Sequence, residues 1–245
     1  MHRLLLTLLL ISPAVFAQDR GRMYFHGSIG LAGGDFSFEN DPRTLDDDTD
    51  AGLFQLEFEA TSRRGFGGGI RFESVVSDDD LFVRNGAPAN EARMGTLFAH
   101  FTYRFEEHRF AMPVRVGVIV NALTFEENAT GLETQYASVG PYFEVEPEVT
   151  LIRRGPFRWS LYGQFGAGIG GTAIEIDNDF RDYDSATAFI GLELGTRFRV
   201  GPGELGIGYI GRFQSMDESD LEAGQFVFAH DSSFNGLLVT FGVTF

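Results

Sequence analysis

Apolar residues alternate with small or polar residues along most of the chain. The last nine residues show this pattern most clearly, with apolar side chains at every second position: Leu237, Val239, Phe241, Val243 and Phe245. Successive side chains of an extended strand point to opposite faces, so a period of two predicts a β-strand with one apolar face. The chain is therefore predicted to end in a strand.

The same alternation predicts ten strands, joined by connections that are alternately long and short. Short turns are expected near residues 62, 106, 153 and 201, and long connections at 34–51, 78–88, 126–137, 175–185 and 214–233. The predicted strand from Ser138 to Ile152 contains Pro141 and Pro147. Proline cannot donate a hydrogen bond to a neighbouring strand, so we expect a bulge near Pro147.

The two faces of the predicted strands indicate a membrane barrel. A soluble barrel has a polar outer face, whereas here the bulky, continuous face is apolar and the other face carries Gly, Thr, Glu and Arg. An even number of strands with alternating short turns and long loops is typical of transmembrane barrels. We predict an all-β fold, an antiparallel up-and-down transmembrane β-barrel of about ten strands, formed by residues 18–245.

This pattern, with the terminal Phe245, resembles the outer-membrane β-barrel proteins of diderm bacteria. The resemblance implies an outer-membrane location, with outer-membrane lipid and lipopolysaccharide as partners. It also implies that Phe245 is an assembly signal for the barrel-assembly machinery. A monomer is expected.

The N-terminus predicts export. Residues 1–17 combine a short basic head, an apolar run and a small-residue ending at Ala17, as in a secretory signal peptide. The composition adds two exclusions. A net charge of −16 disfavours binding to nucleic acid, and the chain has no cysteine for a disulfide or a thiolate metal site. We expect no cofactor.

Charged residues on the inner face predict a plugged barrel. Eight strands enclose a lumen just filled by side chains, so ten strands with long side chains inside should leave little space. The expected interior charge network is Glu57, Glu59, Arg71, Glu73, Arg104, Arg115, Glu144, Glu146, Glu148, Glu193, Arg197, Arg199 and Arg212. Hairpin geometry predicts Arg71 beside Glu57 and Glu59, and Arg212 beside Glu193. A structural network is one interpretation, and a narrow path for ions or small solutes is the other.

Catalytic signals are weak. Ten-stranded outer-membrane proteases of the omptin family use an Asp pair and an Asp/His pair at the external rim, and the comparable residues here are Asp78, Asp80, His230 and Asp231. Adjacent His and Asp residues in a strand point to opposite faces, which argues against this omptin-like alternative. We therefore predict a non-enzymatic barrel whose acidic extracellular loops serve surface interaction or envelope integrity.

The acidic tracts also suggest a metal alternative. Clustered carboxylates suit Ca²⁺, and the candidate ligands are Asp46, Asp48, Asp177 and Asp179. Neither tract has the spacing of a known calcium loop. Solvated loop charge is the simpler interpretation.

Overall fold

The computed structural model describes residues 23–41, 45–78, 80–82, 89–177, 179, 183–220 and 225–245. The predicted signal peptide, residues 1–17, lies outside this part of the chain. Within it, no helix is long and apolar enough to cross a membrane.

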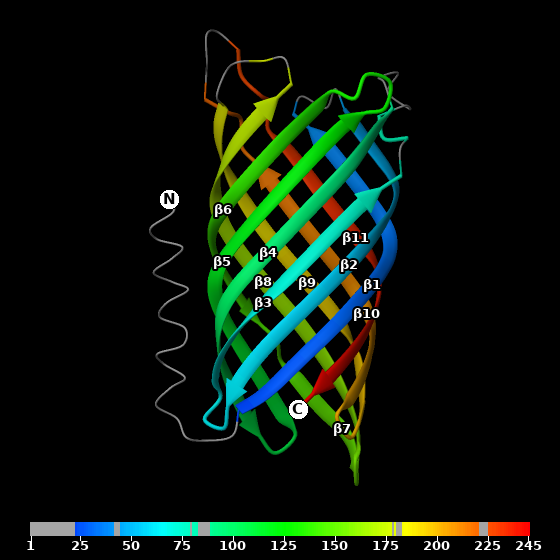
Figure 1. Ribbon diagram of the computed structural model, residues 1–245, viewed down its shortest axis with the longest axis vertical. Coiled ribbons are helices and arrows are strands. Elements are labelled where there is room, and N and C mark those ends of the chain that lie inside the picture. Colours follow the sequence, from blue (N-terminus) through cyan, green and yellow to red (C-terminus); the bar gives the residue numbers. More distant parts are fainter. Residues whose placement is uncertain are drawn as a thin grey trace.

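The described residues form one closed antiparallel barrel (Figure 1). Its strands are β1 (Met23–Asn40), β2 (Asp46–Ser62), β3 (Phe66–Ser77), β4 (Asn90–Glu107), β5 (Phe110–Glu127), β6 (Glu133–Val145), β7 (Glu148–Arg154), β8 (Phe157–Ile176), β9 (Tyr183–Val200), β10 (Gly203–Met216) and β11 (His230–Thr244). Strands β1 and β11 pair, so the first and last strands close the wall. The short turns and the C-terminus lie at the lower end in Figure 1, and the long connections lie at the upper end.

Strands β6 and β7 form one interrupted strand of the wall, which confirms the predicted irregularity at Pro147. Both pair with β5 on one side and with β8 on the other. The Gly163 N–H donates to the Pro147 carbonyl at 3.0 Å across the interruption. The register shifts between Thr150 and Ile152. Counted this way, the wall has the ten strands that the sequence predicts.

The strands are longer than predicted, and the expected loop at 34–51 is wrong. β1 continues to Asn40 and β2 begins at Asp46. The physical reason is that the alternation continues with its polarity reversed. In this segment Phe36 and Phe38 point inward and are buried. Asp35, the residue before Phe36, points outward and is exposed.

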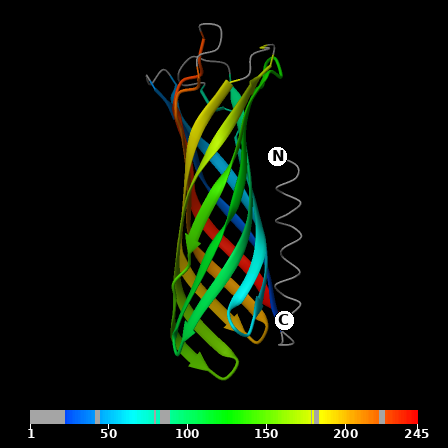
Figure 2. The ribbon, with the colours of Figure 1, turned by 90° about the vertical axis from the view of Figure 1, so that its left-hand side faces the viewer.

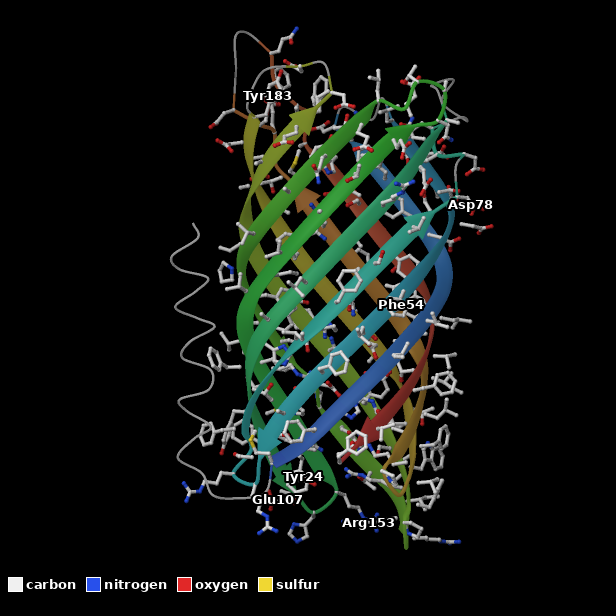
Figure 3. All side chains as sticks on the ribbon, in the orientation of Figure 1. Tyr24, Phe54, Asp78, Glu107, Arg153 and Tyr183 are labelled. Atoms are coloured by element: carbon white, nitrogen blue, oxygen red, sulfur yellow. The ribbon has the colours of Figure 1, made fainter. Side chains whose placement is uncertain are left out.

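This reversal divides the barrel into two parts. Below it, an apolar belt surrounds the barrel and includes Leu31, Phe54, Phe58, Ile70, Phe72, Leu97, Val116, Phe143, Phe165, Ile190, Leu194, Ile207 and Phe241, all exposed. Above it, the upper part has an acidic outer surface and a buried apolar core. Phe54 lies on the belt, whereas Asp78 and Tyr183 lie at the upper end (Figure 3). The side view shows the strands of both parts running as one continuous wall (Figure 2).

Candidate functional site

The barrel interior is the candidate functional site, and its lower half holds an ionic network. Arg115 on β5 is its centre. The Arg115 Nε lies 2.8 Å from Glu59, and Nη1 lies 2.8 Å from Glu144 and 2.6 Å from Glu146. All four side chains are buried. Because a guanidinium has five donors in a planar fork, one arginine can bridge carboxylates from β2, β6 and the β6–β7 break.

Arg71 and Arg212 join opposite walls of the barrel. Glu57 lies opposite Arg71 in register, as the hairpin prediction requires, but the Arg71 guanidinium binds Glu144 at 2.7 Å and Glu73 at 3.1 Å. Arg212 binds Glu73 at 2.6 Å and lies 3.9 Å from Glu193. Arg71 is therefore opposite Glu57 as predicted, whereas Glu193 lies two residues along β9 from Gly191, the residue opposite Arg212. The shortest contacts of both arginines cross the lumen.

The lower end of the network contains two residues that were not predicted from the sequence, Arg158 and Glu204. Arg199 binds Glu204, and its Nη1 lies 2.7 Å from Glu148. Arg158 lies 3.2 Å from Glu148. The sequence signal was present for Arg158, which stands between the apolar residues Phe157 and Trp159, whereas Glu204 follows Gly203 of the turn. Arg197 links Glu146 to Glu204.

Arg104 departs from the predicted network. Its side chain is partly exposed, and its ion partner is Glu106, at 3.6 Å. Glu106 is the penultimate residue of β4, at the lower end, so Arg104 belongs to the mouth of the barrel. Glu193 remains inside and accepts a hydrogen bond from the Tyr162 hydroxyl at 2.7 Å. His100 and Thr102 both contact Glu59.

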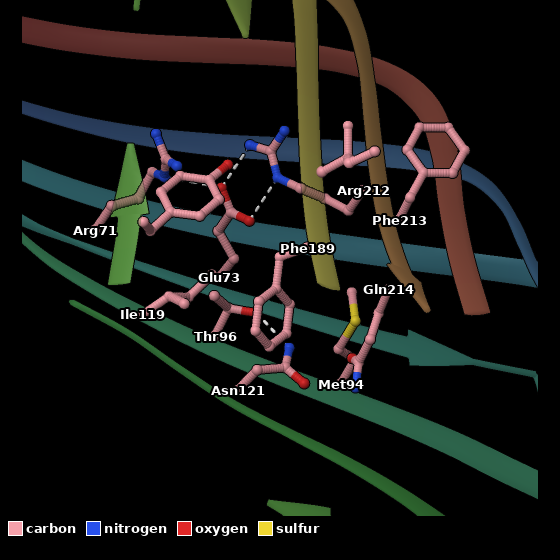
Figure 4. A pocket seen from close by; sticks show the side chains of 12 residues that line it. Arg71, Glu73, Met94, Thr96, Ile119, Asn121, Phe189, Arg212, Phe213 and Gln214 are labelled. Atoms are coloured by element: carbon pink, nitrogen blue, oxygen red, sulfur yellow. Dashed lines mark hydrogen bonds and ion pairs between the residues drawn. The ribbon is translucent and has the colours of Figure 1, made fainter. Parts of the chain in front are cut away.

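A neutral polar layer lies above the ionic network. On β4 and β5, the Asn121 amide donates to Thr96 at 2.8 Å. The Ser138 and Thr172 hydroxyls are 2.6 Å apart on β6 and β8. A cavity of about 30 Å³, lined in this layer by Thr96, Asn121 and Gln214, lies beside the Arg212–Glu73 ion pair (Figure 4).

An aromatic plug fills the upper part. It consists of Phe36, Phe38, Phe82, Phe125, Tyr136, Tyr183 and Phe234, all buried. The Phe38 ring centroid lies 5.3 Å from Phe82 and 4.9 Å from Phe125, both edge to face. Edge-to-face packing is a favourable aromatic geometry. The interior is therefore filled at three levels, by ion pairs, by neutral polar groups and by aromatic rings.

The residues of the omptin-like alternative are not brought together by any described contact. His230 points inward and is buried, with its ring 5.0 Å from Phe38 and 4.7 Å from Tyr136. Burial lowers the pKa of His230 to about 4. Asp231 points to the outer surface, as alternation predicts. Asp78 is also exposed, and Asp80 accepts a hydrogen bond from Thr49.

The calcium candidates lie on one strand, β2, and in the connection between β8 and β9. Asp46 and Asp48 are exposed on the outer face of β2. Asp177 accepts a hydrogen bond from the Glu133 N–H at 3.0 Å, and Asp179 accepts one from the Tyr183 hydroxyl at 3.0 Å. The described residues contain no group of three His, Cys, Asp or Glu side chains placed to hold a metal ion. The calcium site stays a prediction.

Comparisons with known proteins identify the fold. No family model matches the sequence, and no curated protein matches it. The outer-membrane protease OmpT from Escherichia coli is similar in structure, with a TM-score of 0.53 and 12% identity over 91% of this chain and 96% of OmpT. The translocator domain of the autotransporter NalP from Neisseria meningitidis has a TM-score of 0.45 and 9% identity, over 100% of this chain and 95% of that domain. The chain therefore has the closed antiparallel β-barrel fold of bacterial outer-membrane proteins.

Proposed function

We propose that this chain is a non-enzymatic barrel of the bacterial outer membrane, closed to solutes, whose acidic upper end faces the cell exterior. In this proposal the apolar belt contacts lipid, and the upper surface serves interaction with other molecules or envelope integrity. Assembly by the barrel-assembly machinery and a monomeric state in lipid and lipopolysaccharide belong to the same proposal.

The filled interior is the observation that carries the proposal. Open channels are typical of barrels with about 16 to 18 strands, and barrels of about eight strands are filled by side chains. The ten strands here are crossed by buried ion pairs such as Arg71–Glu144 and Arg212–Glu73, and the aromatic plug lies above them. A solute would have to displace both layers.

Solute flux tests the proposal. Residues 18–245, refolded into liposomes, should give no swelling in small sugars beyond that of protein-free liposomes, and no unitary conductance in planar bilayers. A general porin refolded in parallel is the positive control. Sugar-driven swelling or steady unitary currents would contradict a closed barrel and support the narrow-channel alternative.

Location and activity need separate measurements. The chain should fractionate with the outer membrane and migrate differently on SDS gels before and after heating, because folded barrels resist SDS. A panel of fluorogenic peptides should not be cleaved, since His230 is enclosed by aromatic rings. Cleavage that disappears in His230→Ala would overturn the non-enzymatic assignment in favour of the omptin-like one.

A further inference from the structure

The cavity in the neutral polar layer is lined by buried polar groups that have no partner. Gln214 on β10 is 3% exposed, and both its Nε2 and its Oε1 lack a hydrogen-bond partner among the described residues. The Asn121 Oδ1, on β5, also lacks one, and Asn121 lines the same cavity. Next to the lining, Ser232 on β11 is opposite Gln214 in register, and its buried hydroxyl also has no partner among the described residues.

Leaving such groups unpaired is costly. A buried amide without a hydrogen bond destabilises the folded state, and both Gln214 and Asn121 have such groups at this cavity. The neighbouring residues cannot solve it. Met94, Ile119 and Phe189 are apolar, and the Thr96 hydroxyl already accepts from the Asn121 amide. Arg212 already donates to Glu73 and to two backbone carbonyls. The missing partner must therefore be a molecule inside the cavity.

The size and chemistry of the cavity select the ligand. A volume of about 30 Å³ exceeds the roughly 10–15 Å³ needed for one water molecule and is far below the roughly 150 Å³ that accommodates benzene. The ligand must donate to the Gln214 and Asn121 oxygens and accept from the Gln214 amide. It must also be neutral, because the Arg212 and Glu73 charges beside the cavity are already paired with each other.

We propose that this cavity is an internal hydration site that holds about two ordered water molecules, bound by Gln214 and Asn121. The waters complete the hydrogen bonds of the polar layer and connect it to the Arg212–Glu73 pair below. The aromatic plug separates them from the upper end of the barrel. The site does not depend on the proposed biological function, because it follows from the interior of the fold.

Nuclear Overhauser measurements between water and methionine methyl groups provide the test. The unmodified chain is labelled at its methionine methyls and refolded in micelles. Met94 lines the cavity, whereas Met216 is 1% exposed in the apolar core of the upper part and serves as the internal control. We expect a cross-peak to water at the Met94 methyl and at the Gln214 side-chain amide, and none at Met216.

A Gln214→Leu variant gives an independent readout. If water molecules satisfy Gln214, the variant loses the hydrogen bonds between the Gln214 amide and these waters. Its unfolding midpoint in denaturant then does not rise. If the cavity is dry, the variant removes an unsatisfied buried amide and the midpoint rises. The absence of a water cross-peak at the Met94 methyl, or a raised unfolding midpoint in Gln214→Leu, would contradict the hydration site. Solute flux through the barrel would contradict the proposed function but not the hydration site.

Discussion

Arg115 shows how much the interior depends on a single side chain. Its guanidinium contacts the carboxylates of Glu59, Glu144 and Glu146. Without it, Glu144 and Glu146 keep Arg71 and Arg197, whereas the buried Glu59 loses its arginine partner. Breaking a buried ion pair by removing one partner costs about 3–5 kcal/mol. We expect Arg115→Leu to lower the free energy of unfolding by at least that amount, measured by urea unfolding in micelles.

Arg93 is the matched control. Its side chain is 53% exposed and pairs with Glu91 and Glu126 on the outer surface. Exposed ion pairs contribute little, so Arg93→Leu should change stability by less than about 1 kcal/mol. Equal effects of the Arg115 and Arg93 substitutions would show that the network does not support the fold.

His230 predicts a loss of stability in acid. Burial lowers its pKa from 6.5 to about 4, so the folded state keeps the ring neutral while the unfolded state takes up a proton below pH 6.5. Stability is therefore lost as pH falls from about 6.5 towards 4. By linkage, the change between pH 7 and pH 5 is about 2 kcal/mol.

A His230→Phe variant should lose this part of the pH dependence and keep the aromatic packing with Phe38 and Tyr136. The measurement is the free energy of unfolding at pH 7 and pH 5. His108, whose side chain is 89% exposed in a turn, is the control, and His108→Phe should keep the wild-type slope. An unchanged slope in His230→Phe would contradict the assignment.

At the scale of elements, the upper halves of β1 and β2 have a polar outer face. Asp35 and Asp48 are exposed above the belt, whereas Leu31 and Phe54 are exposed on it. The chain has no cysteine, so single cysteines report position cleanly. We expect Asp35→Cys and Asp48→Cys to react rapidly with a charged maleimide in proteoliposomes, and Leu31→Cys and Phe54→Cys to be protected. Equal labelling of all four cysteines would contradict a boundary between the apolar belt and the polar outer surface at this level of the barrel.

The same boundary explains what the sequence could and could not predict. Strand number, strand faces and the break at Pro147 follow from the period of two and from the missing proline N–H. Strand length did not follow, because Phe36 and Phe38 continue the alternation of β1 with the apolar face turned inward. The ion-pair partners within the network could not be predicted from the sequence either. The sequence gives hairpin neighbours, but only the curvature of the closed wall brings Arg71 to Glu144.

At the scale of the whole molecule, Phe245 lies where the barrel closes. The Phe245 N–H donates to the Phe25 carbonyl at 2.9 Å, and the Phe25 N–H donates to the Phe245 carbonyl at 3.2 Å. The Phe245 ring is 79% exposed, so it adds little packing to the folded state. We expect deletion of Phe245 to lower the amount of barrel inserted in cells while leaving the thermal stability of the inserted fraction nearly unchanged.

Phe105, which is exposed at the same end, is the control for this deletion. A Phe105→Ala variant removes a similar ring from the lower rim without altering the C-terminus, and it should insert with the normal yield. Normal yield after deletion of Phe245 would contradict its role as an assembly signal.

The two ends of the barrel carry opposite charge. Exposed arginines, among them Arg63, Arg64, Arg153 and Arg154, outnumber the exposed carboxylates Glu106 and Glu107 at the lower turns, and exposed carboxylates such as Asp48, Asp78 and Asp217 stand on the upper part. Figure 3 shows Arg153 at the lower end and Asp78 at the upper end. The molecule is thus a permanent electric dipole along its axis. Copies inserted in the same direction present like charges to one another at both ends, so they repel laterally, and the repulsion weakens as salt shortens its range. Spacing between copies in a bilayer therefore becomes a function of ionic strength.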